Sequence, residues 1–454
     1  MSDSIEPASG GPFYRVLRRV VEVEPAEVKA LAWTWLYFFA LLSSYYVIRP
    51  IRDEAGVAGG VNNLPWLWMG TLAGTTIANP PFSALVAKFP RVQFVAWTYR
   101  FFIANLVVLF LLLHYTSGVG NIWAGRVFYV WVAVFNLFVP SVFWGFMTDL
   151  FTREQGKRLF GFISAGGTLG GIAGSLLTAG LVEKIGAPYL LILSAALLEL
   201  AVFSVRRLSR FAEGLRQRKG LATQEKPIGG GIISGITHAF GSGYMLAISL
   251  NLLLFAILST FLYFQQAQLV ESTIPDRAAR TIFFARVDIL MNSLTVLTQM
   301  FATGRLIKAV GLVATLSFVP AMSALGFFLL ATVPSLTIVV WFQALRRAAN
   351  FAIARPTREI LFIVLPREDR YKAKSFIDTF IYRAGDQVGA WSYALMGVLS
   401  LGLVGTSWVA IPISIVALAN AVGLGRQQER LAAGHTPDET HAPLTARPAA
   451  ATLE

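Results

Sequence analysis

The sequence contains no cysteine, which excludes disulfide bonds, thiolate metal sites and a cysteine nucleophile. Histidine is also scarce, and the four histidines of the chain form no group with the spacing of a zinc site. A metalloenzyme is therefore disfavoured. We expect neither a metal nor a cofactor.

Charged residues are also scarce in this sequence. They make up 14% of the chain, against about 25% in an average soluble domain, whereas hydrophobic residues make up 55%. Stretches of about 20 mostly apolar residues, enough to span a bilayer, recur between residues 28 and 424. The sequence thus predicts an all-α membrane protein with twelve transmembrane helices. The predicted spans are 28–48, 64–87, 92–114, 122–148, 158–182, 187–205, 242–264, 282–303, 309–332, 335–362, 373–398 and 404–424.

The basic residues outside these spans are distributed unevenly. With a cytoplasmic N-terminus, 24 lysines and arginines lie on the cytoplasmic side and five on the other. Because cytoplasmic loops carry the excess of positive charge, we expect an integral protein of a bacterial inner membrane with both termini cytoplasmic. The basic residues behind the net charge of +13 thus lie mainly in the cytoplasmic loops and not on one face of a soluble module. We therefore expect no nucleic acid partner.

The polar segments divide the chain into five predicted regions. These are a cytoplasmic N-terminal segment (1–27), an N-terminal six-helix bundle (28–205), a basic cytoplasmic linker (206–241), a C-terminal six-helix bundle (242–424) and a disordered cytoplasmic tail (425–454). The tail is assigned on its polar, Pro/Ala-rich composition.

The two predicted bundles share short sequences. Phe-Ala-Leu-Leu-Ser at 39–43 returns as Phe-Ala-Ile-Leu-Ser at 255–259, and Thr-Arg-Glu at 152–154 returns as Pro-Arg-Glu at 366–368. Offsets of 216 and 214 residues indicate a duplicated six-helix unit. Since six is even, the repeat is parallel, a 6+6 arrangement as in major facilitator transporters. In that architecture substrate binds near the midplane between the halves, which makes transport the leading function.

Apart from Lys29, Arg158 and Lys374 at the ends of spans, which are assigned to the cytoplasmic side, eight arginines but no lysine fall within the predicted spans: Arg100, Arg126, Arg286, Arg346, Arg347, Arg355, Arg358 and Arg383. Each costs roughly 2.5–3.5 kcal/mol at a helix centre, so these side chains should line a polar cavity or pair with acidic residues. Structural pairing is one interpretation, because Arg355 and Glu359 are spaced i,i+4, and Arg383 lies three residues before Asp386 and five after Asp378. Binding of an anionic substrate, which the planar guanidinium suits, is the other.

The first predicted helix ends in Ile-Arg-Pro-Ile-Arg-Asp-Glu at 48–54. Pro50 should break the helix, which leaves Arg49 and Arg52 on one side of a turn with Asp53 as a charge partner. The segment is then either a solvated rim or an anion-attracting entrance.

Five glycines in the fifth predicted helix, at 166, 167, 170, 171 and 174, are only superficially similar to a phosphate-binding loop. Neither a closing Gly-Lys-Ser/Thr nor a preceding strand is present. Their spacing favours a smooth helix face, and we expect another helix to pack closely against it.

Two further stretches are Phe-Trp-Gly-Phe-Met-Thr-Asp at 143–149, followed by Lys-Arg at 157–158, and Tyr-Lys-Ala-Lys-Ser-Phe-Ile-Asp at 371–378. Both resemble segments of the nucleotide transporter family, the ATP/ADP translocases of plastids and obligate intracellular bacteria. Arg52-Asp53 resembles that family's basic-Asp pair. The resemblance extends over most of the membrane domain and implies a major-facilitator-like antiporter for nucleotides or other phosphorylated anions.

The resemblance also implies roles for single residues. Arg52 matches a basic residue implicated in phosphate binding, and Asp149 matches an acidic residue important for transport. The family has Gly-Lys-Ser-Gly-Gly in the eleventh helix, but this chain has Gly-Asp-Gln-Val-Gly at 385–389. Asp386 thus replaces a substrate-contacting lysine, which argues against unmodified ATP/ADP exchange. Arg383, about one turn earlier, is a candidate to compensate.

The predicted function is an antiporter-type secondary transporter and not an enzyme, a monomer whose partners are a small anionic solute, such as a nucleotide, and membrane lipid. The candidate substrate-binding residues are Arg49, Arg52, Asp149, Arg346, Arg355, Arg358 and Arg383. The candidates for charge pairing or proton coupling are Asp53, Asp378 and Asp386. One alternative is a proton-coupled major-facilitator exporter of another solute. The other is a membrane enzyme or lipid-handling protein, for which Arg-Glu-Asp at 367–369 is the best loop candidate.

Overall fold

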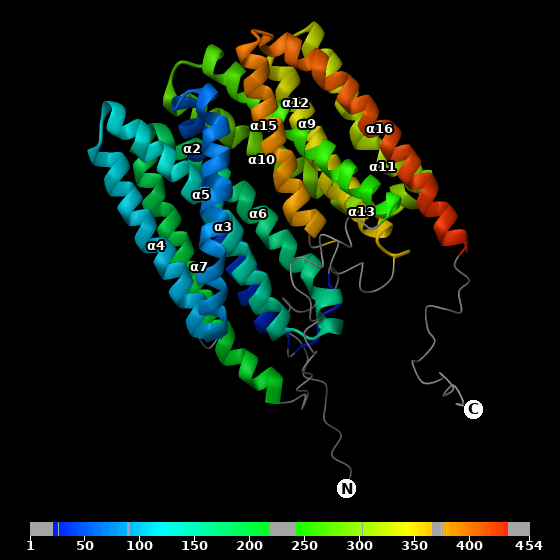
Figure 1. Cartoon of the computed structure of the whole chain (residues 1–454). Coiled ribbons are helices and arrows are strands. Elements are labelled where there is room, and N and C mark those ends of the chain that lie inside the picture. Colours follow the sequence, from blue (N-terminus) through cyan, green and yellow to red (C-terminus); the bar gives the residue numbers. More distant parts are fainter. Residues whose placement is uncertain are drawn as a thin grey trace, which may run out of the picture.

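The computed structural model describes residues 21–25, 27–88, 91–217, 242–301, 303–365, 374 and 376–434. Over these residues the chain forms helices and no strand, and the helices make two bundles that lie side by side (Figure 1). We call the face at which α2 begins and α16 ends the terminal face. The opposite face, at which α2 ends, is the distal face.

The helices of each bundle follow one another in chain order. The N-terminal bundle contains α2 (Val28–Ala58), the 3-10 turn η1 (Val61–Asn63), α3 (Leu64–Lys88), α4 (Arg91–Tyr115), α5 (Gly118–Leu150), α6 (Arg153–Ile185) and α7 (Ala187–Gln217). The C-terminal bundle contains α9 (Gly243–Thr273), α10 (Arg277–Phe301), α11 (Thr303–Thr332), α12 (Leu336–Ala349), the π-helix η2 (Asn350–Ala354), α13 (Arg355–Leu361), the π-helix η3 (Ile377–Ile381), α15 (Tyr382–Val398) and α16 (Gly402–Gly434).

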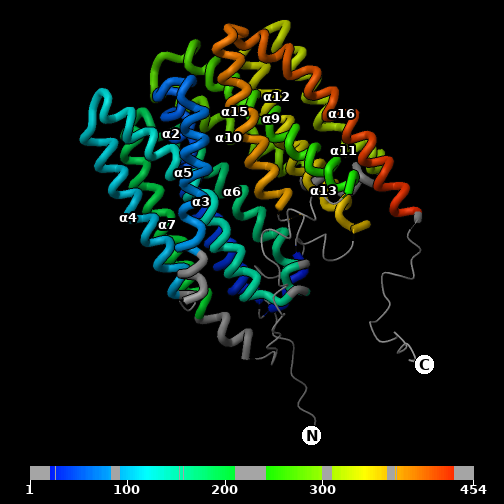
Figure 2. The backbone as a smooth tube through the Cα atoms, viewed as in Figure 1, coloured from blue at the N-terminus to red at the C-terminus, as the bar shows by residue number. Residues whose placement is uncertain are grey.

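Each bundle therefore has six helical segments in the described part of the chain, if α12, η2 and α13 count as one segment and η3 and α15 as another. Nine helices among the described residues are long and apolar enough to cross a membrane. Two helices of the C-terminal bundle, α10 and α15, lie next to the N-terminal bundle (Figure 2): α10 packs on α2 and α6, and α15 packs on α3.

Local sequence explains several helix ends. Thr152 and Gln155 form a capping box at the start of α6, in which each side chain accepts a hydrogen bond from the backbone of the other. Gly60 and Gly186 follow the ends of α2 and α6 with φ angles of 86° and 84°, which favour glycine. Gly311, with φ of 78°, divides α11 into two pieces, close to the predicted span start at 309.

The predicted break at Pro50 is wrong, because α2 continues through Pro50 to Ala58. A proline removes one backbone donor, but in a membrane bundle side chains of neighbouring helices can bond the freed carbonyl groups. Thr178 Oγ1 of α6 donates to the carbonyl of Val47, beside the interrupted turn, at 2.9 Å.

Other predicted helix ends are also too early: α9 continues beyond 264 to Thr273. Helix α7 continues beyond 205 to Gln217, and α16 continues beyond 424 to Gly434, into the region predicted as a disordered tail. The rest of the predicted linker, 218–241, and of the tail, 435–454, lies outside the described residues. The division into five regions stays a prediction.

The glycine face of α6 packs closely on α2, as predicted. A Cβ atom at Gly170 would lie 2.3 Å from the carbonyl oxygen of Phe39, and one at Gly174 would lie 2.4 Å from that of Ser43. In the C-terminal bundle, Gly385 of α15 packs in the same way on Leu253 of α9. The contact between the first and fifth helices of one bundle thus recurs in the other, which agrees with a parallel duplication.

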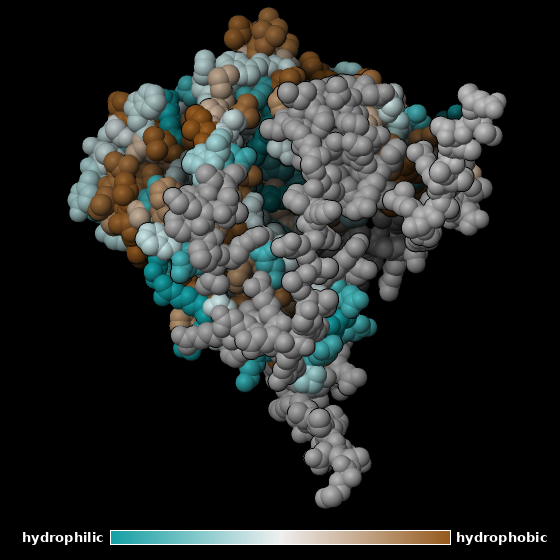
Figure 3. All heavy atoms as spheres, turned by 60° about the horizontal axis from the view of Figure 1, so that its bottom comes forward, coloured by the Kyte–Doolittle hydropathy of each residue, from teal (hydrophilic) through white to brown (hydrophobic). Residues whose placement is uncertain are grey.

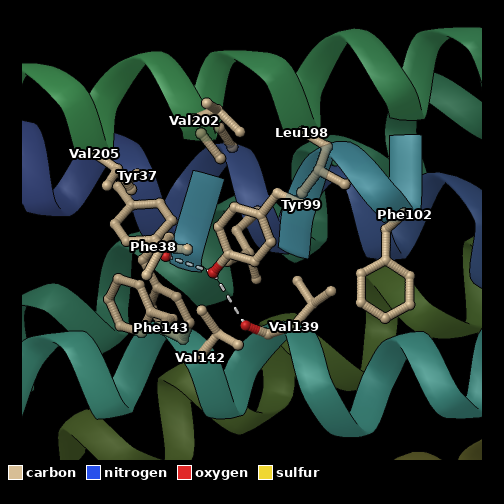
Figure 4. Packing of buried hydrophobic residues seen from close by; sticks show 14 of the residues in the cluster. Tyr37, Phe38, Tyr99, Phe102, Val139, Val142, Phe143, Leu198, Val202 and Val205 are labelled. Atoms are coloured by element: carbon tan, nitrogen blue, oxygen red, sulfur yellow. Dashed lines mark hydrogen bonds between the residues drawn. The ribbon is translucent and has the colours of Figure 1, made fainter. Parts of the chain in front are cut away.

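The core of the N-terminal bundle contains buried tyrosines (Figure 4). The Tyr37 and Tyr99 hydroxyls are hydrogen-bonded to each other, and Tyr99 donates to the carbonyl of Val139 at 3.2 Å. Phe143 stacks on Phe38 with ring centroids 4.1 Å apart. The Phe-Trp-Gly-Phe block at 143–146 therefore positions α5 against α2.

Candidate functional site

A cavity of about 120 Å³ lies between the two bundles. It is lined by residues of α2, α3, α5 and α15, namely Tyr45, Arg52, Trp68, Thr71, Leu72, Val132, Ala133, Asn136, Arg383, Asp386 and Gln387. The view onto the terminal face shows hydrophilic side chains recessed near the middle of the molecule and hydrophobic ones on its flanks (Figure 3). Three of the predicted site residues, Arg52, Arg383 and Asp386, thus meet in one cavity although they lie far apart in the sequence.

Arg52 is held in position from both bundles. Its Nη1 lies 3.2 Å from Asp53 Oδ1, and its guanidinium carbon lies 4.1 Å from the ring centroid of Tyr129. Tyr263 of α9 donates a hydrogen bond of 3.1 Å to the same Asp53 oxygen. The Nε atom of Arg52 is buried and has no hydrogen-bond partner among the described residues.

The opposite wall of the cavity belongs to α15. Arg383 Nη1 lies 3.6 Å from Asp386 Oδ2, so the predicted i,i+3 pair is present. The glycine face of α15, at 385 and 389, packs on α9. Asp386 lies on a different face of α15 and lines the cavity together with residues of the N-terminal bundle. The side chain of Asp386 is 8% exposed, whereas that of Arg383 is 39% exposed and accessible to a solute.

Arg346 does not reach this cavity. It is buried within the C-terminal bundle, where its guanidinium donates to Ser323 Oγ at 3.0 Å, Ser259 Oγ at 2.8 Å and the carbonyl of Phe255 at 3.0 Å. No carboxylate of the described residues lies within ion-pair distance. Arg346 and Arg358 line a second, water-sized cavity of about 20 Å³ between α9, α11, α12 and α13.

The other predicted residues lie toward the terminal face. Asp149 is at the end of α5, Arg355 begins α13 and Asp378 is in η3, and none of them lines the cavity between the bundles. The predicted pair of Arg355 and Glu359 is wrong, because Glu359 pairs with Lys374 instead. A single anion site that contains all the predicted residues is thus not formed. Substrate binding by any one of them stays a prediction.

The sequence analysis missed the ion pairs that join the bundles. Arg49 of α2 donates to Asp288 Oδ1 of α10, and Arg277 of α10 pairs with Glu54 of α2 through two hydrogen bonds of 2.7 and 3.0 Å. In the described part of the chain, the hydrogen bonds and ion pairs between the bundles begin at Tyr46, just past the middle of α2, and continue to the distal end of that helix and to Val61 beyond it. The only signals in the sequence were an acidic residue within a predicted span, Asp288, and charged residues just beyond span ends.

Several solved structures share this arrangement at 12–13% sequence identity. One is a bacterial homolog of the human lysosomal transporter Spinster in an inward-facing, unoccupied conformation, with a TM-score of 0.56 over 90% of this chain and 99% of that one. Another is a bacterial homologue of the iron transporter ferroportin in an inward-facing state, with a TM-score of 0.59 over 89% and 98%. A third is an auto-inhibited POT family peptide transporter, with a TM-score of 0.55 over 91% and 98%.

No protein-family profile matches the chain, and neither does any curated protein. The structural similarity confirms the predicted fold class, a major-facilitator-like all-α membrane protein. The chain is thus an integral, multi-pass membrane protein.

Proposed function

We propose that this chain is a secondary active transporter of the antiporter type, which carries a small anionic solute by alternating access. The observation that supports this most directly is the presence of two guanidinium groups, Arg52 and Arg383, that line one cavity from opposite bundles. A solute that bridges them contacts both halves at once. Its binding energy can then differ between the two orientations of the halves, which a transport cycle requires.

The charges between the bundles favour an anion. Among the residues that line the cavity there are two guanidinium groups, Arg52 and Arg383, and one carboxylate, Asp386. Arg49 and Arg347 also share a single carboxylate, Asp288. The guanidinium fork binds phosphate or carboxylate through two parallel hydrogen bonds. Phosphorylated solutes are therefore the class that we place first.

The remaining cavity wall suits an organic group on that anion. Tyr45 and Trp68 supply aromatic surface, and Asn136 and Gln387 supply amides that can donate and accept. Gln387 Oε1 is buried without a hydrogen-bond partner among the described residues. A nucleotide-like solute carries groups that suit each of these side chains, namely an aromatic ring, hydrogen-bond donors and phosphates.

The resemblance to nucleotide transporters agrees with this proposal, and Asp386 marks the chain as a divergent member of such a group. The proposed location is a bacterial inner membrane with both termini cytoplasmic. The terminal face, where α2 begins, is then the cytoplasmic one, and the bundles are joined at the outer face.

Binding can be tested by thermal unfolding of the purified protein with ADP, ATP, sugar phosphates and dicarboxylates. A solute at about 100 times its Kd should stabilise the protein by about 2.7 kcal/mol. Arg52→Ala and Arg383→Ala should lose this stabilisation. Arg100→Ala together with Glu199→Ala is the matched control, because these two residues pair at 3.0 Å on the outside of the N-terminal bundle, away from the cavity, and the double variant leaves no charge unpaired.

The screen tests both the proposed binding site and the proposed substrate class. A solute that stabilises the wild type and the double control variant but neither cavity variant supports the proposed site. Equal stabilisation of all four proteins would place the binding site elsewhere. Stabilisation by none of these anions would remove the proposed substrate class.

A further inference from the structure

A buried acidic residue, Asp288 of α10, lies between arginines of both bundles. Arg49 of α2 donates to its Oδ1 atom, and Nη1 of Arg347, on α12, lies 4.0 Å from the same atom. Asp288 is 3% exposed. One carboxylate thus neutralises two guanidinium groups, one from the opposite bundle and one from its own.

A second set of contacts supports the first. Tyr46 of α2 donates to Asn292 Oδ1 at 3.2 Å, and Arg347 Nη2 donates to the Tyr46 hydroxyl at 3.3 Å. The Oδ2 atom of Asp288 and the Nδ2 atom of Asn292 are buried and have no hydrogen-bond partner in the described part of the chain. One oxygen of the Asp288 carboxylate therefore accepts no hydrogen bond, although two guanidinium groups lie beside the other oxygen.

The location of this cluster connects it to the proposed substrate cavity. Arg49 precedes Arg52 by three residues on α2, so the two guanidinium groups project from neighbouring turns of one helix. Arg347 is partly exposed, at 26% of its side chain. Arg49 is thus the cation of α2 next to the cavity residue Arg52, and both Arg49 and Arg347 lie beside Asp288.

We propose that Asp288 acts as an internal anion that holds the empty protein closed at the distal face, and that a substrate anion releases Arg49 from it. This inference rests on the proposed transport function. When the halves separate without substrate, Asp288 loses Arg49 while both groups are still shielded from water, so reorientation of the empty protein is unfavourable. When a substrate anion takes Arg49, the halves can separate without an uncompensated charge. Only the loaded protein then reorients, which produces exchange rather than net transport.

A purely structural role for the pair is the simpler interpretation, and the structure argues against it. A structural pair would join helices that stay together, as Arg100 and Glu199 do within the N-terminal bundle. The pair of Arg49 and Asp288 instead joins helices that alternating access must separate. Arg277 and Glu54 also join the bundles, but Arg277 is 54% exposed, so solvent and salt weaken that pair.

The absence of native cysteine makes a direct test of the closed state simple. Val119→Cys and Ser272→Cys place one spin label on each bundle at exposed positions of the distal face. Pulsed electron paramagnetic resonance then gives the distance distribution between the labels without any added solute. The wild-type background should show a short distance. Asp288→Asn should raise the ratio of long to short distances by about tenfold or more, because it leaves Arg49 without its partner.

Two further variants separate the proposed role from loss of folding. Asp288→Glu keeps a carboxylate between Arg49 and Arg347 across the same interface, and it should keep the short distance. Glu199→Gln removes the carboxylate of an ion pair within one bundle and should leave the distribution unchanged. The proposal is overturned if Asp288→Asn and the wild type have the same distribution.

Transport mode provides the second readout, with ADP as the probe. Wild-type protein in liposomes should take up labelled ADP only when unlabelled ADP is inside, whereas Asp288→Asn should also take it up into ADP-free liposomes. Wild-type uptake that is independent of internal ADP, or that is driven by a pH gradient and lost in Asp288→Asn, contradicts the proposal. If no protein takes up ADP but the distance shift occurs, the proposed substrate fails, while the role of Asp288 in closing the distal face is retained.

Discussion

Arg52 and Arg346 show two ways in which a guanidinium group is kept inside this protein. Arg52 has a carboxylate, an aromatic ring and an unpaired Nε atom, and it lines the cavity between the bundles. Arg346 has three neutral oxygen partners and lies within one bundle. The sequence places Arg346 within a predicted span and Arg52 just beyond one, but of the two only Arg52 lines a cavity where a solute can contact both halves.

Asp386 offers the sharpest prediction at the level of one residue. Its carboxylate lies beside Arg383 and competes with a bound anion for that guanidinium. Asp386→Asn removes the competition, so it should tighten binding of a phosphorylated anion by about tenfold, measured by calorimetric titration of ADP or the best ligand of the screen. Asp386→Lys, which restores the lysine of the nucleotide transporter pattern, should tighten it further.

The same variants test the alternative function. In a proton-coupled exporter, Asp386 would be the residue that carries the proton, and Asp386→Asn would abolish transport driven by a pH gradient. Weaker anion binding in Asp386→Asn, together with loss of proton-driven transport, would favour the exporter over the anion antiporter.

The sequence predicts some of the residues of the site and misses others for physical reasons. The cost of charge in a membrane predicts that Arg383 and Asp386 line a polar cavity or pair with opposite charges, and the structure has them paired in the wall of one cavity. The cost of charge does not say which cavity a charged residue lines. The sequence therefore groups Arg346 and Arg358 with the other candidates, although the packing of α9, α11 and α12 encloses Arg346 and Arg358 in a separate cavity. The pairing of Arg49 with Asp288 is set by the contact between α2 and α10, which no local pattern encodes.

At the scale of helices, hydropathy predicts the elements well and their ends less well. A run of apolar residues marks the part of a helix in lipid, but α7 and α16 continue beyond it as more polar helix, to Gln217 and Gly434. Pro50 was predicted to end the first helix, yet the surrounding bundle, with Thr178 bonded beside the interrupted turn, allows α2 to continue.

The close contact of α6 with α2 leads to a prediction about stability. A side chain at Gly170 would meet the backbone carbonyl of Phe39 at 2.3 Å, which cannot move without displacing α2. Gly170→Ala should therefore lower the free energy of unfolding by about 1–3 kcal/mol, as overpacked cores do, measured by thermal unfolding in detergent.

Gly180 of the same helix provides the matched control. A Cβ atom there meets no other atom within 4 Å, so Gly180→Ala should leave stability unchanged or raise it by up to about 1 kcal/mol through helix propensity. Equal destabilisation by both substitutions would show that helix flexibility, and not contact with α2, is the important property of these glycines.

At the scale of the whole molecule, the even number of helical segments and the basic loops predict a common side for both chain ends. Reporter fusions after residues 218 and 436 should both give a cytoplasmic signal, because the basic residues that flank these positions are retained on that side. A signal from the opposite side at either position would refute the twelve-helix arrangement.

Transport of an anion through the cavity between the bundles is best measured as exchange in liposomes, with the anion that stabilises the wild type most in the thermal screen supplied labelled outside and unlabelled inside. The four proteins to compare are the wild type, Arg52→Ala, Arg383→Ala and the surface control, Arg100→Ala together with Glu199→Ala. If the cavity carries the anion, the wild type and the control should exchange it rapidly, and both cavity variants should exchange it no faster than protein-free liposomes. Exchange by Arg52→Ala and Arg383→Ala at the wild-type rate would contradict transport through this cavity.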